Sequence, residues 1–238
     1  MRIRAALHVH STWSYDGTCS LTEVAALFRR FGYGCVLMSE HSRTFDEARW
    51  LEYRSACASA SDQILLIPGI EYEDAANDVH VLVWGAESFF GAAPETLDML
   101  RRVRAERALA ILAHPNRRGA LGRVTGESGS LLDGIEIWNR RYDGWVPPMP
   151  IPALEGDVLE TVGLDFHRRL DFFPLALELD VTSPLSAEAV VDAIRMARYV
   201  RTLAGIPVSR VAGGPGRRVA ASLDRARKAA ARLFGLGS

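Results

Sequence analysis

The six histidines of this 238-residue chain fall in one ordered series, with acidic residues between them. Imidazole is the commonest protein ligand for transition metals, and carboxylates suit harder or bridging positions. Because every histidine of the chain lies in this one series, the pattern predicts a fold that brings these side chains together in a polynuclear metal site. The series reads His8-Val9-His10, Asp16, Glu40-His41, Glu71, His80, His114-Pro115 and Asp165-Phe166-His167.

Short apolar runs alternate with longer amphipathic stretches, which is typical of βα units on a parallel sheet or barrel. The runs predict strands at 3–10, 35–39, 64–71, 79–84, 109–113, 135–138, in a segment leading into Asp165, and at 172–179. Helices are predicted at 20–31, 45–60, 94–108, 186–200 and 216–233, the first opened by a Ser20–Glu23 capping box. The metal-type residues lie at or just past the carboxyl ends of predicted strands, where α/β barrels place their active sites.

Composition fits one large domain with a sizeable core, since 48% of the residues are hydrophobic. The formal net charge of -1 gives no overall attraction to nucleic acid or anionic membranes. Three cysteines without framework spacing favour a reducing, cytoplasmic location. No signal peptide or membrane-spanning run is expected. Four prolines predict a loop over Tyr142–Glu155, near the mouth of the site.

His8 and His10 are two apart on a strand, so both side chains project from one face. From this pair onward, the series resembles the PHP (polymerase and histidinol phosphatase) superfamily. The family pattern is H-x-H, then D or H, an E/D-H pair, a lone E, a lone H, H-P and a closing G-x-D-x-H, which here is Gly163-Leu164-Asp165-Phe166-His167. The resemblance spans about Ile3 to Arg201, and all nine ligand positions hold permitted residue types.

This resemblance implies an α/β fold, a distorted (β/α)7 barrel with its metal site at the carboxyl ends of the strands. We expect residues 1–238 to form a single domain of this type, with 214–238 forming a C-terminal helix packed on the barrel. The resemblance also implies two to three divalent ions of zinc, manganese or iron. One ion would bind His8, His10, Glu71 and Asp165, a second Glu71, His80 and His114, and a third Asp16, His41 and His167.

The implied activity is hydrolysis of a phosphoester by a metal-activated water at a trinuclear site. Glu71, Asp165 and His167 would be the catalytic residues. Three substrate classes compete: a small phosphomonoester, a nucleotide or oligonucleotide, and a phosphoprotein. The compact chain and near-zero charge favour a small molecule over nucleic acid, for which a basic track is expected. The resemblance also suggests that Phe166 narrows the wall of the site, and that no subdomain is inserted between Glu71 and His114.

Arginines near the metal motifs are the expected substrate ligands, because the guanidinium fork matches phosphate. Arg117 and Arg140 are the favoured candidates and Arg43 follows His41, although each could equally lie on the solvated surface. Asn116 and Asn139 are weaker candidates. Glu40 is expected to orient His41 rather than bind metal. The carboxylates Asp133, Glu136 and Asp143 have no distinguishing context and are expected on the surface.

Two further features have alternative interpretations. The aromatic residues near the predicted strand ends could stack a base, but in a barrel they more often pack the core; they are Trp13, Tyr15, Trp138 and Trp145. The basic residues of 217–232 could bind nucleic acid, although the apolar stripe of the same segment favours a packed outer helix.

Two competing functions remain open. One is a non-catalytic metal-binding PHP module, which the complete ligand series disfavours. The other is an amidohydrolase-like hydrolase of a non-phosphate substrate, which the number of metal positions disfavours. The expected partner is a small phosphorylated substrate, no membrane partner is expected, nucleic acid is possible but not favoured, and the sequence leaves the oligomeric state open.

Overall fold

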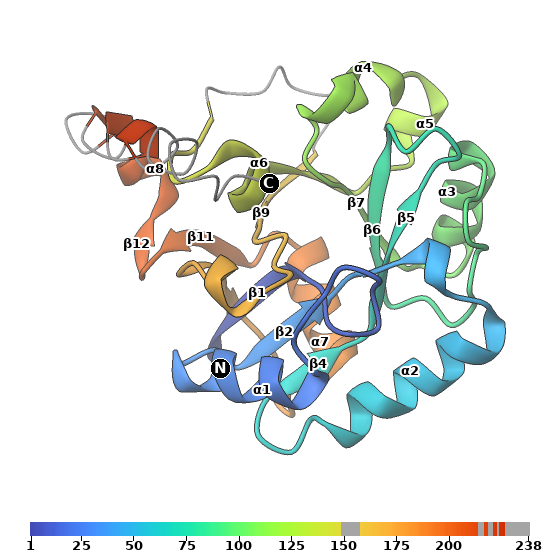
Figure 1. The fold of residues 1–238 in the computed structure, drawn as a ribbon, viewed down its shortest axis with the longest axis horizontal. Coiled ribbons are helices and arrows are strands. Elements are labelled where there is room, and N and C mark those ends of the chain that lie inside the picture. The colour runs from blue at the N-terminus through green and yellow to red at the C-terminus, as the bar shows by residue number, and fades with distance from the viewer. Residues whose placement is uncertain (149–157, 214–216, 219–220, 223, 227–238) are drawn as a thin grey trace.

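The computed structural model describes residues 1–148, 158–213, 217–218, 221–222 and 224–226. Within these ranges the chain forms a mixed α/β fold with two six-stranded sheets (Figure 1). The first sheet has the order β12 (Ile206–Pro207), β11 (Tyr199–Leu203), β10 (Leu175–Asp180), β1 (Arg2–Val9), β2 (Cys35–Met38) and β4 (Leu65–Ile67). The second has the order β3 (Glu40–His41), β5 (Gly69–Glu73), β6 (His80–Trp84), β7 (Leu109–Leu112), β8 (Gly134–Asn139) and β9 (Leu159–Gly163).

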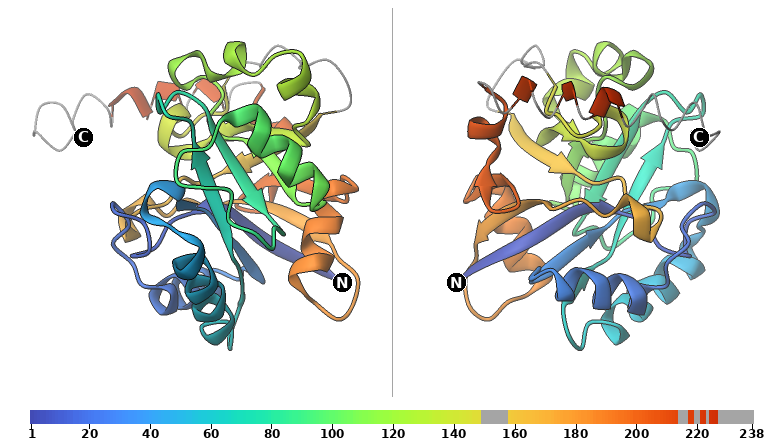
Figure 2. Two further views of the ribbon diagram at one scale, coloured as in Figure 1. Left: turned by 90° about the vertical axis from the view of Figure 1, so that its right-hand side faces the viewer. Right: turned by 60° about the vertical axis from the view of Figure 1, so that its left-hand side comes forward.

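The helices lie outside the sheets. The Ser20–Glu23 capping box opens the first helix as predicted, with Ser20 accepting from the backbone N–H of Glu23. Figure 2 shows α1 and α2 at one end of the molecule and α3 to α5 at the other. The helices are α1 (Leu21–Arg30), α2 (Glu47–Ser59), α3 (Thr96–Ala105), α4 (Ala120–Arg123), α5 (Glu127–Ser130), α6 (Arg140–Asp143), α7 (Ala187–Arg195) and α8 (Val208–Val211).

Two pieces of chain pass from the first sheet to the second. Ser39 separates β2 from β3, and Pro68 separates β4 from β5. Proline has no N–H to donate to a ladder, so the predicted strand over 64–71 is in fact two strands. On the other side, the segment after β9 hydrogen-bonds to β1: Leu164 N–H donates to Leu7 O at 3.0 Å, and His10 N–H to Phe166 O at 2.8 Å. The two sheets therefore meet at β1 as well as at these breaks.

The orientation of β6 corrects one expectation. His80 is the first residue of its strand and not at the carboxyl end. However, β6 runs antiparallel to both β5 and β7. Its amino end therefore lies at the same edge as the carboxyl ends of its neighbours, and His80 still reaches the other ligand-type residues.

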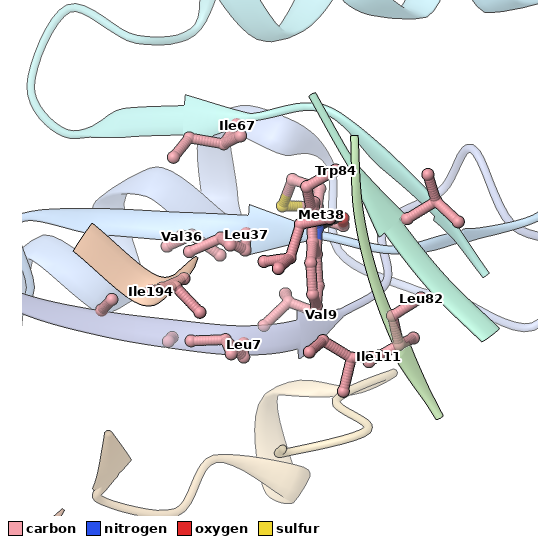
Figure 3. Packing of buried hydrophobic residues seen from close by; sticks show 14 of the residues in the cluster. Leu7, Val9, Val36, Leu37, Met38, Ile67, Leu82, Trp84, Ile111 and Ile194 are labelled. Carbon is pink, nitrogen blue, oxygen red and sulfur yellow. Dashed lines mark hydrogen bonds between the residues drawn. The ribbon is translucent and has the colours of Figure 1, made fainter. Parts of the chain in front are cut away.

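The core lies between the sheets and the helices. Figure 3 shows Leu7, Leu37, Met38 and Trp84 packed together, with Ile194 of α7 against the first sheet. The indole N–H of Trp84 donates to Met38 O at 2.6 Å, which joins β6 of the second sheet to β2 of the first. This buried contact contributes to fixing how the two sheets dock.

Several predicted boundaries differ from the structure. The helix expected over 186–200 ends at Arg195, and Tyr199–Leu203 forms strand β11 instead. The strand expected from Phe172 begins at Leu175. In the predicted 142–155 loop, Tyr142 and Asp143 belong to α6, and residues 149–155 lie outside the described ranges. The C-terminal helix expected at 214–238 lies largely outside them too, although 217–218, 221–222 and 224–226 are helical.

The three cysteines, Cys19, Cys35 and Cys57, are free and buried. Across the described residues, no helix combines the length and the apolar character needed to cross a membrane.

Candidate metal centre

The carboxylate of Glu71, on β5, lies at the centre of the ligand-type residues. Its side chain is buried, and its oxygens lie within 3.5 Å of nitrogen atoms from five histidines. The distances are 2.7 Å to His80 Nδ1, 3.0 Å to His114 Nε2, 3.1 Å to His41 Nδ1, 3.4 Å to His8 Nε2 and 3.5 Å to His10 Nε2. The histidines come from both sheets and from the segments that join their strands.

The other two carboxylates complete the cluster. Asp165 Oδ1 lies 3.9 Å from Nε2 of both His8 and His10. Asp16 lies 3.4 Å from His41 Nε2 and 3.0 Å from His167 Nε2. The structure thus brings all nine sequence-predicted ligand positions together. Ligand atoms within 4.8 Å of one another form the trios His8–His10–Asp165, His8–Glu71–His114 and His10–His41–His167.

The way the imidazoles are held fits metal binding. In His8, His10 and His167, Nδ1 faces a protein group, and Nε2 is left for the centre of the cluster. A ligating histidine is oriented in this way, through the ring nitrogen that does not bind metal. In His41, Nδ1 lies near both Glu73 and Glu71. The Nε2 atoms of His8 and His10 are buried and have no hydrogen-bond partner among the described residues. A buried polar atom without a partner is costly, and a bound cation would satisfy both.

The spacing of the donors fits as well. At metal–nitrogen distances of about 2.0–2.1 Å, two donors on a tetrahedral ion are about 3.4 Å apart. The distances from Glu71 to His8 and to His10 are close to this value. Nitrogen and carboxylate donors together suit zinc, manganese and iron.

Glu136 is the main functional residue that the sequence interpretation missed. It was expected on the surface, but its side chain is buried. One oxygen lies 2.9 Å from His8 Nδ1, and the other accepts from the backbone N–H of His114 and from Asn139 Nδ2, both at 2.9 Å. Glu136 therefore holds two ligand-type residues. A lone glutamate between two isoleucines in a strand carries no sequence signal for this position.

Glu73 and Glu40 hold other parts of the cluster. Glu73 Oε1 lies 2.6 Å from His41 Nδ1, and Arg43 donates to Glu73 Oε2. Glu40 was expected to orient His41 rather than bind metal. Its carboxylate accepts from Ser11 and Ser14, and the same Ser14 Oγ accepts from the backbone N–H of His41 at 3.0 Å. Since Ser14 Oγ lies 3.2 Å from His10 Nδ1, Glu40 acts on His10 through Ser14.

The backbone is strained at three of the ligand-type residues. His8, Asp165 and His114 have positive φ angles of 61°, 52° and 27°. Such conformations cost about 1–3 kcal/mol each for residues other than glycine, and they cluster at functional sites. The register of β1 against β2 shifts at His8. The fold therefore bends the backbone where these side chains enter the cluster.

The electrostatics of the cluster favour cations. Burial alone would lower the pKa of His8, but the charges of Glu136, Glu71 and Asp165 outweigh it and raise that pKa well above its usual value. Burial would raise the pKa of Glu71, but the surrounding histidines hold it well below its usual value. Burial, together with His167 and His41, lowers the pKa of His10 and keeps its ring neutral, which is the form that binds metal.

A cavity of about 90 Å³ opens onto the cluster. Ligand-type residues line its floor, and the other lining residues are Tyr15, Asn77, Arg117, Arg141 and Tyr142. Of the three arginines proposed from sequence, only Arg117 lines it. Arg43 is engaged with Glu73, and the Arg140 guanidinium lies over the ring of Phe173.

Of the four aromatic residues proposed as a stacking wall, only Tyr15 lines the cavity, where its ring stacks on His41. Trp13 packs against Phe45 and Tyr53, and Trp138 and Trp145 against Phe173. Phe166 was expected to narrow the site, but it is buried in the core against Phe28.

Asn116 and Asn139 do not line the cavity. Asn139 instead caps α6 through its Oδ1.

Comparison with known proteins identifies the fold. No family model matches the chain, and no curated protein matches it. Endonuclease Q in complex with a 27-mer duplex carrying an abasic lesion superposes with a TM-score of 0.59 at 12% identity, over 82% of this chain and 57% of that one. The lesion-specific endonuclease PfuEndoQ from Pyrococcus furiosus superposes with a TM-score of 0.56 at 12% identity, over 82% of this chain and 56% of that one. PsfC from Pseudomonas syringae PB-5123 superposes with a TM-score of 0.56 at 12% identity, over 81% of this chain and 88% of that one.

At these identities the similarity concerns the fold alone. The chain spans just over half the length of the endonucleases, and most of PsfC. It therefore shares the fold of these three proteins over about four-fifths of its own length.

Proposed function

We propose that this protein is a metal-dependent hydrolase that cleaves a phosphoester, most simply a small phosphomonoester or a nucleotide. The observation that carries the proposal is the buried Glu71 carboxylate, with nitrogen atoms of five histidines within 3.5 Å, at the floor of an accessible cavity. The shared fold with two proteins named as endonucleases supports the same reaction class.

The proposed centre holds two to three divalent ions of zinc, manganese or iron. His8, His10, Glu71 and Asp165 would hold one; Glu71, His80 and His114 a second; and Asp16, His41 and His167 a third. When bound, such ions supply Lewis acidity, a nucleophile at neutral pH and neutralisation of phosphate charge. If β2 and β3 are counted as one interrupted strand, and β4 and β5 as another, the order β1, β2–β3, β4–β5, β6, β7, β8, β9 has seven strands. This order fits a distorted seven-stranded barrel around the proposed centre.

The chain's own residues have distinct tasks in this proposal. Glu71 lies where it can join two ions, Asp165 and His167 complete the centre, and all three are proposed as catalytic residues. Glu136 and Glu73 hold His8 and His41 by their Nδ1 atoms. Hydrolysis breaks the ester P–O bond, adds water to phosphorus and leaves an alcohol that takes up a proton.

The test measures phosphate release from a panel of monoesters and nucleotides, and release of cleaved strands from short oligonucleotides and an abasic-site duplex, with added manganese. His10→Ala is the site variant, and Arg104→Ala, an exposed change on α3, is the matched control. We expect release that His10→Ala abolishes and Arg104→Ala leaves intact. Fully metallated protein that hydrolyses none of these phosphoesters would instead favour a non-catalytic module, and turnover of an amide or carboxylic ester would favour amidohydrolase-like chemistry.

A further inference from the structure

The arginines near the cavity differ in what they already bind. Arg117 donates from Nε to the Tyr142 hydroxyl at 2.8 Å, from Nη1 to Asn77 O at 2.7 Å and from Nη2 to Asn77 Oδ1 at 2.9 Å. Its Nη1 also lies 3.0 Å from His80 Nε2. Most donors of Arg117 are therefore occupied by the protein, and its geometry suits positioning of His80 rather than capture of a substrate.

Arg141 is the arginine in a different situation. Its side chain lines the cavity and is exposed, and within the described residues it makes no hydrogen bond or ion pair. Its neighbour Arg140 points elsewhere, over the ring of Phe173 at 5.4 Å. The guanidinium of Arg141 therefore keeps its donor fork for a ligand in the cavity.

The backbone of Arg141 is tied to the metal centre. Its N–H donates to Asn139 Oδ1 at 3.0 Å, and Asn139 Nδ2 donates to Glu136. Glu136 in turn contacts His8 Nδ1. Arg141 is thus presented at a position fixed by the same hydrogen bonds that hold the ligand-type residues, although its side chain is free.

The size of the cavity limits what it can hold. Pockets that bury drug-sized ligands are about 300–1,000 Å³. The cavity at the cluster measures about 90 Å³. A small head group of the substrate matches this volume, and the rest would lie beside the exposed rings of Tyr15 and Tyr142. A terminal phosphoryl group meets this limit, whereas a phosphodiester continues on both sides of the phosphorus atom.

We propose that Arg141 is the substrate-binding arginine of this site, and that it pairs with the oxygens of a terminal, dianionic phosphoryl group. This inference rests on the proposed phosphoesterase function. It names a residue that sequence reasoning passed over in favour of its neighbour Arg140. It also narrows the substrate class to phosphomonoesters whose leaving group remains outside the cavity.

The test compares Arg141→Ala and Arg141→Lys with Arg104→Ala in manganese-loaded protein. Steady-state kinetics use 4-nitrophenyl phosphate as the monoester and bis(4-nitrophenyl) phosphate as the diester. Calorimetry with inorganic phosphate measures anion binding independently of turnover. We expect Arg141→Ala to raise KM for the monoester and to weaken phosphate binding, each about tenfold or more, with kcat much less affected. Arg141→Lys should recover part of the loss, since it keeps the charge without the fork.

Unchanged KM and phosphate affinity in folded Arg141→Ala would overturn the assignment of Arg141 and leave the phosphoesterase proposal intact. A wild-type preference for the diester would overturn the substrate class. Arg141-dependent phosphate binding without turnover of any ester would instead overturn the phosphoesterase proposal and keep the anion site.

Discussion

At the scale of single residues, orientation of the imidazoles is what distinguishes this cluster from an ordinary polar core. Three histidines, His8, His10 and His167, are held by Nδ1, and their Nε2 atoms face the cluster. Glu136 holds His8 and also accepts from the backbone of His114. It touches two of the ligand-type residues without lining the cavity.

Glu136→Gln should therefore weaken metal binding while the fold is kept. The amide has the shape of the carboxylate but lacks the charge that favours His8, and loss of such an outer partner typically costs 10–100-fold in metal affinity or activity. Chelator competition followed by metal analysis measures the effect. Glu52→Gln, an exposed change on α2, is the control. Equal metal retention by the two variants would show that Glu136 has no such role.

The nine ligand positions could be proposed from sequence because their order is informative, whereas their supports could not. Glu136 looks like any polar residue in a strand, and Glu73 like any acidic residue after one. The choice between Arg140 and Arg141 depends on the direction of two adjacent side chains in a short helix, which spacing does not determine. The anchor that orients His10, Ser14, depends on a loop conformation that no periodicity encodes.

At the scale of elements, β8 and β9 approach each other closely behind the metal centre. Gly163, the last residue of β9, faces Glu136: a Cβ at this position would lie 1.7 Å from Glu136 Oε1 and 3.1 Å from His8 Cβ. The glycine of the closing G-x-D-x-H pattern is thus required for space, so that Glu136 can reach His8.

Gly163→Ala should push the Glu136 carboxylate from His8. Overpacking of this kind costs about 1–3 kcal/mol, and metal affinity should fall with it. Gly122→Ala is the matched control, because its Cβ would meet nothing within 4 Å. Urea unfolding and metal content measure both effects. If both alanine variants had the stability and metal content of the wild type, the close approach of Gly163 to Glu136 would not matter for either property.

Tyr33 links the turn before β2 to the start of β10. Its hydroxyl donates to Leu175 O at 3.0 Å, and burial raises its pKa to about 12. Because the folded pKa is above the unfolded value of about 10, the unfolded state loses this proton first. The stability from the neutral phenol is complete below about pH 10 and is lost as the pH rises toward 12.

Tyr33→Phe should cost about 1–3 kcal/mol at pH 8, since Leu175 O loses its donor. The same variant should lose less stability than the wild type between pH 10 and 12, where up to about 3 kcal/mol depends on the phenol. Urea unfolding at intervals across this range compares the two proteins. If the free energy of unfolding of the two proteins fell in parallel with pH, the Tyr33 phenol would not be the source of this pH dependence.

Sequence patterns predicted most elements of the fold, and the misses have local causes. Pro68 breaks the strand predicted over 64–71, and the proline itself is a sequence signal for such a break. After Arg195, Ala197 adopts a positive φ of 51° and ends the helix, although nothing in the composition of 196–200 separates a helix from a strand. The arrangement into two sheets depends on long-range pairing that a single sequence does not reveal.

At the scale of the whole molecule, the proposed metal centre joins residues from both sheets. His8 and His10 belong to β1 and to the residue just after it, whereas Glu71 and His80 belong to the second sheet. Ions held by these groups would bind only the folded chain, since the sheets must be docked to form the site.

Metal should therefore stabilise the protein as a whole. At a concentration of 100 times Kd, one ion adds about 2.7 kcal/mol, which for a chain of this size raises Tm by several degrees. Thermal melts with manganese or with a chelator measure the shift. His10→Ala should reduce it, and Asp62→Asn, an exposed loop change, should not. A Tm independent of metal in the wild type would contradict the proposed centre.

The antiparallel course of β6 has a practical consequence for engineering. This course brings His80 to the edge shared by the other ligand-type residues, and the described residues that line the cavity include none from the turns at the opposite edge. The turn around Asp62, between α2 and β4, is one of these, and Asp62 is exposed there. Flexible insertions in surface turns cost little free energy. A reporter domain inserted at Asp62 should therefore leave the proposed metal centre at the opposite edge intact.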